Sequence, residues 1–390
     1  MNYLVIDTES TGGLRESKGS ALDPRNRLCY VGLLNSMDCI ILPIEYEVGR
    51  PYSDELYDIQ RRVAVCDILV FFNAKHDLHW LRRYKIKFQD KPIWDCQLAE
   101  FILHGQTEPF PDLDATSKRY GAEGKEKNLE EEYYRRGKDT CDIPQEVLET
   151  YLRGDLRCTE QTFLGQTEFL REKKKLCQLI LLNCQDELIT QEMEWNGIKV
   201  DLRSLQERAL QLESRIIAID NALFHLVGDS RINWDSPLQV GTVLYGGEII
   251  FKSREDYLFT YKDVKKQPVI KSRVVEKSVS FPRLVEPLPR TETLLGTYST
   301  DTRVLQRLKA FAKAKSVVEL ILERRGNQTQ IDRYFRGIPT KYRAMGWQDE
   351  IIHGQLHHCV AITGRLSSSQ PNLQNIDERA RSCLTTRFRV

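Results

Sequence analysis

The sequence lacks any long apolar run, and no stretch approaches the roughly 20 consecutive apolar residues that a membrane-spanning helix needs. Its first ten residues, MNYLVIDTES, have neither the basic segment nor the cleavage site of a secretory signal. The ten cysteines include no C-x-x-C pair, which argues against a disulfide framework or a zinc site and favours reduced, buried thiols. These absences predict a cytoplasmic protein without a membrane partner.

Net charge is also nearly absent, because 57 basic and 56 acidic residues leave a formal charge of +1. A value near zero argues, at first, against a nucleic-acid partner. The charges are unevenly spread, however: residues 1–170 hold 22 basic and 30 acidic residues, and residues 171–390 hold 35 and 26. This asymmetry indicates two parts with different tasks, with chance variation of a solvated surface as the alternative.

The first 170 residues have the pattern of an α/β domain. Short apolar runs predict buried strands at 3–6, 28–34, 38–44 and 68–72. Helical patterns follow around 53–65, 77–84, 95–104, 111–120, 126–136 and 145–170. Strands interleaved with and followed by helices predict a sheet covered by helices.

From residue 171 onward the pattern becomes mainly helical. Long helices are predicted over 171–194, 201–227 and 301–336, and a basic segment containing several prolines breaks the helical period over 248–298. We therefore expect three parts: an α/β domain over 1–170, a mainly helical region over 171–340 with an extended or hairpin insertion, and a mixed polar segment over 341–390.

Acidic residues recur where the predicted elements of the α/β domain end. Asp7 and Glu9 stand two apart at the end of the first strand, where alternate side chains share a face. Asp77 follows another strand, and Asp155 stands four residues after Tyr151 on a helix. Taken singly, these are more often a solvated strand end, a helix cap, and a packed tyrosine beside a surface carboxylate.

In combination and in this order, D-x-E, N-x₃-D and Y-x₃-D resemble the Exo I, Exo II and Exo III motifs of DnaQ-like (ribonuclease H-like) 3′→5′ exonucleases. The resemblance covers about residues 1–170. It implies hydrolysis at single-stranded 3′ ends with two Mg²⁺ or Mn²⁺ ions. Their ligands would be Asp7, Glu9, Asp77 and Asp155, and Tyr151 would orient the attacking water.

Three further residues of the domain belong to this resemblance. His76 stands where the family has Phe or Tyr before the Exo II aspartate, and we expect His76 and Asn73 near the substrate. The substitution could tune the rate or its pH dependence. Asp95 resembles a recurring aspartate of these domains that is not a metal ligand, and we expect it to cap or support a helix.

Residues 363–375, TGRLSSSQPNLQN, would suggest only a polar loop by composition. The string closely resembles a motif of family A (DNA polymerase I-like) DNA polymerases that contacts the primer–template duplex. The resemblance implies DNA contacts by six residues: Arg365, Ser367, Ser368, Asn372, Gln374 and Asn375. The string at 192–201 is similar to the family's entry into the thumb region, and the strings at 233–241 and 298–301 fit phage-type members. The resemblance therefore covers essentially the whole chain.

The palm and fingers motifs that follow in that family are not found after residue 375. We therefore expect no polymerisation by this chain alone. It would be the proofreading part of a split or truncated phage polymerase in the host cytoplasm, with a second polypeptide supplying the palm and fingers. Two alternatives stay open: a stand-alone nuclease in DNA repair or RNA trimming, and a DNA-binding scaffold with an inactive nuclease domain.

Overall fold

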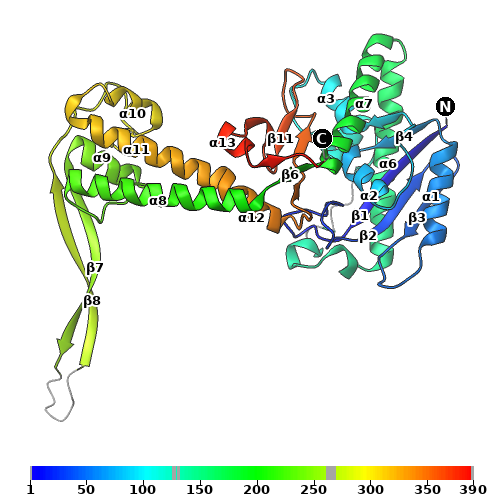
Figure 1. The fold of residues 1–390 in the computed structure, drawn as a ribbon. Helices are drawn as coiled ribbons and strands as arrows, with labels where there is room; N and C mark the ends of the chain where they lie inside the picture. The colour runs from blue at the N-terminus through cyan, green and yellow to red at the C-terminus, as the bar shows by residue number, and fades with distance from the viewer. Residues whose placement is uncertain (1, 125–128, 130–131, 261–268, 388–390) are drawn as a thin grey trace. The chain divides into compact units, whose positions relative to one another are not determined.

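The computed structural model describes residues 2–124, 129, 132–260 and 269–387. The chain divides into two compact units. Unit 1 comprises Met1–Leu202 and Ile338–Val390, and unit 2 comprises Arg203–Gly337 (Figure 1). None of the helices in the described residues is both long enough and apolar enough to cross a membrane.

Unit 1 is built on a five-stranded mixed sheet in the order β3-β2-β1-β4-β5. Its strands are β1 (Tyr3–Ser10), β2 (Leu28–Leu34), β3 (Cys39–Pro43), β4 (Ile68–Phe71) and β5 (Ile93–Asp95). β1, β4 and β5 are mutually parallel, whereas β2 is antiparallel to β1 and β3. The four predicted strands are confirmed, and β5 was not predicted.

The helices described around this sheet are α1 (Ser53–Val65), α2 (Ala74–Arg83), α3 (Cys96–Leu103), α4 (Leu113–Arg119), α6 (Gln145–Leu170) and α7 (Lys174–Asn196). The mixed α/β class agrees with the sequence prediction. The helix predicted over 126–136 falls partly outside the described residues, and its last three residues form a 3₁₀ turn (Tyr134–Arg136). A second 3₁₀ turn, Thr140–Asp142, precedes α6.

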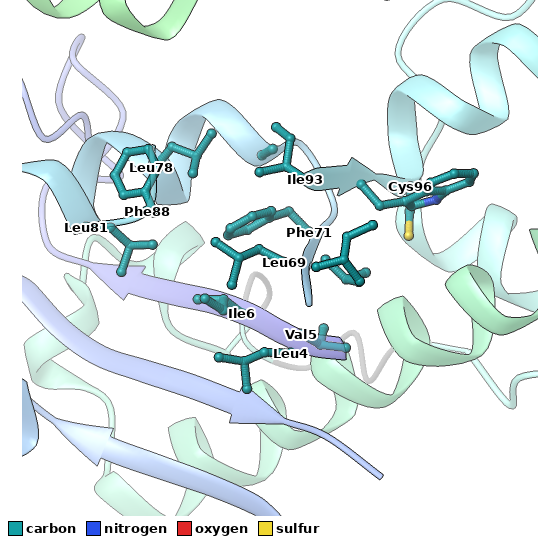
Figure 2. Close-up of a cluster of buried hydrophobic side chains, with 14 of the residues drawn as sticks. Leu4, Val5, Ile6, Leu69, Phe71, Leu78, Leu81, Phe88, Ile93 and Cys96 are labelled. Atoms are coloured by element: carbon teal, nitrogen blue, oxygen red, sulfur yellow. The ribbon is translucent and has the colours of Figure 1, made fainter. Parts of the chain in front are cut away.

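Burial on both faces of the sheet holds this part together. Leu4, Val5 and Ile6 point alternately to opposite faces of β1, and none is more than 2% exposed. Figure 2 shows them packed with Leu69 and Phe71 of β4 and with side chains of α2. Each fully buried side chain of this size contributes about 1.5–3 kcal/mol relative to exposure.

The C-terminal segment belongs to unit 1 and adds two small sheets. β6 (Ile198–Val200) pairs with both β9 (Ile351–Ile352) and β12 (Leu384–Thr385). β10 (Gln355–His357) pairs with β11 (Ser367–Ser369). Two short helices, α12 (Gly337–Ala344) and α13 (Glu378–Arg381), and a 3₁₀ turn (Leu373–Asn375) complete the segment.

The unit boundaries differ from the expected 170/171 and 340/341. They fall instead after residue 202 and after residue 337. α7 stays with the sheet because Ile180 and Cys184 are buried in the same core as the strands. Residues 341–390 stay there because their strands pair with β6.

Unit 2 is mainly helical, as expected, and carries one long hairpin. Its helices are α8 (Leu202–Val227), α9 (Pro237–Tyr245), α10 (Thr302–Leu308) and α11 (Ala312–Gln330), which continues into a π-helical turn (Ile331–Phe335). α8 and α11 run side by side, joined by an ion pair of 2.7 Å between Arg215 Nε and Glu323 Oε1 (Figure 1). The basic insertion forms the hairpin of β7 (Gly247–Phe259) and β8 (Val269–Phe281).

Candidate active site

The carboxyl ends of the parallel strands meet at one edge of the sheet, where α/β proteins place their ligands. Asp7 lies in β1, Asn73 follows β4 with a left-handed φ of 67°, and Asp95 ends β5. The Asp95 carboxylate accepts hydrogen bonds from the backbone N–H groups of Asn73 (3.0 Å) and Ala74 (2.8 Å), and from that of Gln97 (2.8 Å) in α3. Asp95 is therefore the helix-capping support residue that the sequence predicted.

Asp77 lies in the first turn of α2, whose start is fixed by the hydrogen bonds of Asp95. Its Oδ1 accepts a hydrogen bond of 2.6 Å from Thr8 Oγ1, and its side chain is buried. Burial, and secondly the negative charge of Asp7, raises the pKa of Asp77 well above its usual range. A bound cation would remove most of this cost, because it favours the ionised form of both carboxylates.

Asp155 and Tyr151 come from α6, which packs against β2 of the sheet. Gly32 of β2 makes this approach possible, because a Cβ there would stand 2.7 Å from Leu156 Cδ1. Gly32 is also the residue paired with Asp7 in the β1–β2 register. Close packing at this point therefore brings Asp155 onto the same cavity as Asp7.

That cavity has a volume of about 330 Å³, and its lining includes Asp7, Asp155, Asn73, Gln97, Phe110 and Thr159. Burial, followed by the negative charges of Asp155, Glu9 and Asp7, raises the pKa of Tyr151 far above its usual range. Its hydroxyl is therefore protonated at neutral pH. Glu9, two residues after Asp7 on β1, contributes to this rise through its negative charge.

The donor chemistry of these carboxylates fits Mg²⁺ or Mn²⁺, which prefer hard oxygen ligands. Within the described ranges, no three histidine, cysteine, aspartate or glutamate side chains are gathered as a ready-made metal site. The Asp77 carboxylate is turned onto Thr8. The assignment of Asp7, Glu9, Asp77 and Asp155 as metal ligands therefore stays a prediction.

His76 lines a second cavity of about 260 Å³, which shares Asn73, Gln97 and Phe110 with the first. Burial, with a smaller effect of the neighbouring His79, lowers the pKa of His76 to about 4. The ring is therefore uncharged at neutral pH. It can present a neutral aromatic face, as the Phe or Tyr that it replaces would.

Glu194 of α7 is a residue that the sequence reasoning missed. Its carboxylate accepts hydrogen bonds from Lys75 Nζ (2.7 Å) and from the backbone N–H of Leu356 (2.6 Å), and it contacts His79 Nε2 at 2.9 Å. Burial opposes its ionisation, but the hydrogen bond of His79 and the charge of Lys75 bring the pKa of Glu194 down to about 2. One carboxylate thus joins α2, α7 and β10. Each of these partners lies more than 100 residues from Glu194 along the chain, so no local sequence pattern predicts the cluster.

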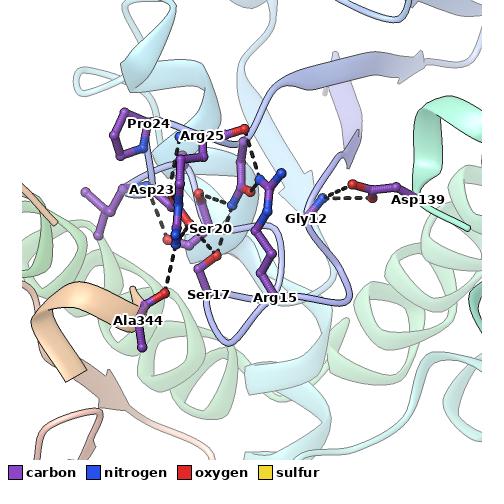
Figure 3. Close-up of polar contacts among 12 residues, drawn as sticks. Gly12, Arg15, Ser17, Ser20, Asp23, Pro24, Arg25, Asp139 and Ala344 are labelled. Carbon is purple, nitrogen blue, oxygen red and sulfur yellow. Dashed lines mark hydrogen bonds and ion pairs between the residues drawn. The ribbon is translucent and has the colours of Figure 1, made fainter. Parts of the chain in front are cut away.

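The loop between β1 and β2 borders the second cavity and is fixed by its own polar network (Figure 3). The buried Asp23 accepts hydrogen bonds from Ser17 Oγ (2.7 Å) and Arg25 Nη2 (2.7 Å). Arg25 also donates to the carbonyl of Ala344 (2.8 Å), and Gly12 N–H donates to Asp139 Oδ1 (2.8 Å). The loop is therefore anchored both to the C-terminal segment and to the turn that precedes α6.

The predicted DNA-contacting residues fall into two groups in the structure. Arg365, Asn372, Gln374 and Asn375 are exposed, and Ser367 is half-buried at the start of β11. Ser368 is buried, and its hydroxyl accepts a hydrogen bond of 3.1 Å from Leu373 N–H. A direct contact between the Ser368 hydroxyl and DNA would thus require this turn to open.

The sequence of this chain is similar to those of known DNA polymerases. Residues 270–389 match the family model for DNA polymerase family A. DNA polymerase I of Synechocystis sp. is 27% identical over 80% of this chain, and that of Geobacillus stearothermophilus is 28% identical over 50%. The matches cover 27% and 18% of those two proteins, so the chain spans less than a third of their length.

A solved structure has a similar fold. It is the polymerase domain of Pol1 from M. smegmatis in complex with DNA primer-template and dNTP, which matches 97% of this chain with a TM-score of 0.68 and 18% identity. The match covers 53% of that chain. Residues 270–389 are therefore similar to DNA polymerase family A, and the curated relatives named above are DNA polymerase I enzymes.

Proposed function

We propose that the sheet domain is a DnaQ-like 3′→5′ exonuclease that removes 3′-terminal nucleotides from single-stranded DNA within a DNA polymerase I-like protein. The observation that carries the proposal is the shared cavity of Asp7 and Asp155, with the buried Asp77 close enough to respond to the charge of Asp7. The exposed residues of 363–375 would help to hold primer–template DNA. The second polypeptide with palm and fingers, and the phage origin, stay predictions.

The proposed chemistry assigns a role to each group at the sheet edge. Asp7, Glu9, Asp77 and Asp155 would hold the ions. Two bound Mg²⁺ or Mn²⁺ ions would lower the pKa of the attacking water and stabilise the attacking and leaving oxygens of an in-line displacement. The protonated Tyr151 hydroxyl orients the water by a hydrogen bond, and Asn73 and His76 contact the 3′-terminal nucleotide.

Asp155→Asn tests this assignment with a nearly isosteric change. Loss of one metal-binding carboxylate removes several kcal/mol of transition-state stabilisation, so we expect a rate roughly 1000-fold lower. The measurement is the release of mononucleotides from 3′-labelled single-stranded DNA in Mg²⁺. Glu168→Gln, an exposed position at the other end of α6, is the matched control and should keep the wild-type rate.

The same assay separates the two alternatives. A nuclease of RNA trimming would degrade RNA 3′ ends faster than DNA 3′ ends. A DNA-binding scaffold with an inactive domain would bind the labelled strand and release no nucleotide at any Mg²⁺ concentration. Preference for DNA ends together with the loss in Asp155→Asn supports the proposed exonuclease.

A further inference from the structure

Among its described residues, the β7–β8 hairpin of unit 2 packs into the core near its base. The two strands pair continuously from Gly247 opposite Phe281 to Phe259 opposite Val269. Ile249 and Phe281 are buried in the core of unit 2, whereas most side chains farther along both strands are exposed. Within the described residues the hairpin is a two-stranded sheet, with no third strand on either side. Such a ribbon is marginally stable alone and leaves two surfaces open to a partner.

The two faces of this ribbon differ in chemistry. Side chains alternate between faces along a strand, and the register assigns one face five notable side chains beyond the base: Tyr257, Phe259, Lys271, Arg273 and Lys277. We call this the aromatic–basic face. Together with Glu255, it carries three cations and one carboxylate.

Rings and cations are in direct contact on the aromatic–basic face. The Arg273 guanidinium lies 5.6 Å from the Tyr257 ring centroid, and Lys271 Nζ lies 3.7 Å from that of Phe259. Tyr257 remains 37% exposed. Lys277 is paired with Glu255 at 2.7 Å, and both side chains are solvent-accessible.

The opposite face provides an internal comparison. Its described strand residues carry no aromatic ring, and two cations, Lys252 and Arg254, stand against three carboxylates. Its exposed apolar groups are aliphatic: Ile250, Leu258, Ile270 and Val274. The excess of positive charge and the rings of the outer hairpin thus both lie on one face.

Cation–π contacts at exposed sites contribute only about 0.5–1 kcal/mol each. They help to hold the ribbon, but they do not require an excess of cations on the same face. Single-stranded nucleic acid needs both parts, because cations neutralise its phosphates and aromatic rings stack on its bases. A duplex would use only the cations, since its base faces are already stacked.

We propose that the aromatic–basic face of the β7–β8 hairpin binds single-stranded DNA. Lys271, Arg273 and Lys277 contact phosphates, and bases stack on Tyr257 and Phe259. The choice of DNA over RNA rests on the proposed function. The hairpin would then hold unpaired DNA in addition to the strand end at the exonuclease site.

Two charge-matched variants of the full chain test the proposal. Arg273→Glu and Arg254→Glu change the net charge equally but lie on opposite faces. We expect Arg273→Glu to weaken binding of a fluorescent oligothymidylate at least about fivefold and to lower the slope of log affinity against log salt by about 1. Arg254→Glu should change affinity less than twofold. Binding is followed by fluorescence anisotropy in EDTA, so that metal-dependent hydrolysis cannot consume the probe.

Two neighbouring residues test the stacking part. Tyr257→Ser removes a ring from the aromatic–basic face and should weaken binding about fivefold. Leu258→Ser exposes the same polar group on the other face and should not. Circular dichroism and thermal unfolding verify that all four variants keep the wild-type fold.

Several results would overturn the proposal. Equal weakening by the two arginine variants would mean a general effect of charge, and no weakening by either would mean that the hairpin does not bind. A loss of duplex DNA affinity in Arg273→Glu as large as its loss of oligothymidylate affinity, or tighter binding of an oligouridylate, would also contradict it. Failure of the proposed exonuclease would appear separately, as absence of hydrolysis by the wild-type chain in Mg²⁺, with the binding comparison unaffected.

Discussion

At the scale of single residues, Glu194 shows how a buried charge can organise a site without being one of its predicted metal ligands. It holds Lys75 and His79, which flank Asp77 on α2, and the backbone of Leu356 in β10. β10 pairs with β11, which carries Ser367 and Ser368 of the predicted DNA-contacting segment. One carboxylate thus fixes the helix of a predicted metal ligand to the strand pair of the polymerase-like motif.

Glu194→Gln should destabilise the chain by about 3 kcal/mol at pH 7, since the pKa of Glu194 lies near 2 against an ordinary 4.5. A lowered pKa contributes stability that is present above the ordinary pKa and is lost as pH falls through the folded value. The difference between wild type and variant should therefore shrink between pH 4.5 and pH 2. Denaturant unfolding at a series of pH values measures it.

Glu192→Gln is the control for this prediction, because Glu192 lies two residues away and pairs with Arg82 at the surface. It should cost less than about 1 kcal/mol. An undiminished effect of Glu194→Gln at pH 3, or an equal loss in the control, would contradict the role given to Glu194.

At the scale of elements, the packing of α6 against the sheet determines whether Asp155 lines the same cavity as Asp7. Gly32→Ala should cost about 1–3 kcal/mol of stability, because the new Cβ would press on Leu156 and Leu152. Displacement of α6 should also slow nucleotide release.

Gly154→Ala is the control for this prediction. It lies within α6, no neighbouring atom lies within 4 Å of the added Cβ, and it should stabilise the chain by about 0.5–1 kcal/mol. Thermal unfolding compares them; equal effects would show that the contact with α6 is unimportant.

The elements also show how far the sequence could predict the structure. The helices predicted at 53–65 and 145–170 match the structure to the residue, and both show a helical period of buried apolar residues. β5 was missed because its three residues, Ile93, Trp94 and Asp95, are too few to show alternation. The pairing of β6 with β9 and β12 joins segments more than 150 residues apart, and no local pattern predicts such a contact.

At the candidate site, local sequence motifs predicted which residues belong together, but the sequence could not predict the contacts between distant segments. The sequence grouped Asp7, Asp155 and Tyr151, and in the structure the two aspartates line one cavity and their charges act on the Tyr151 hydroxyl. It could not show that Asp77 bonds to Thr8, that Gly32 admits α6, or that Ser368 is buried. Those facts depend on packing between elements that are distant along the chain.

At the scale of the whole molecule, near-neutrality conceals an acidic first part and a basic remainder. If the carboxylates at the sheet edge bind cations, Mg²⁺ should raise the melting temperature of the wild-type chain. At 100 times the dissociation constant the gain is about 2.7 kcal/mol. The double variant Asp7→Asn/Asp155→Asn should show no such gain when compared with Na⁺ at equal ionic strength. An equal rise in the double variant would mean that Mg²⁺ acts elsewhere.

The most direct test of the central claim is the hydrolysis of 3′-labelled single-stranded DNA by Asp7→Ala. We predict that this variant keeps the wild-type melting temperature within a few degrees and releases no nucleotide. We also predict that EDTA stops the wild-type reaction and that Mg²⁺ or Mn²⁺ restores it. Release of nucleotides by Asp7→Ala at the wild-type rate would show that the carboxylates at the sheet edge do not form an exonuclease site.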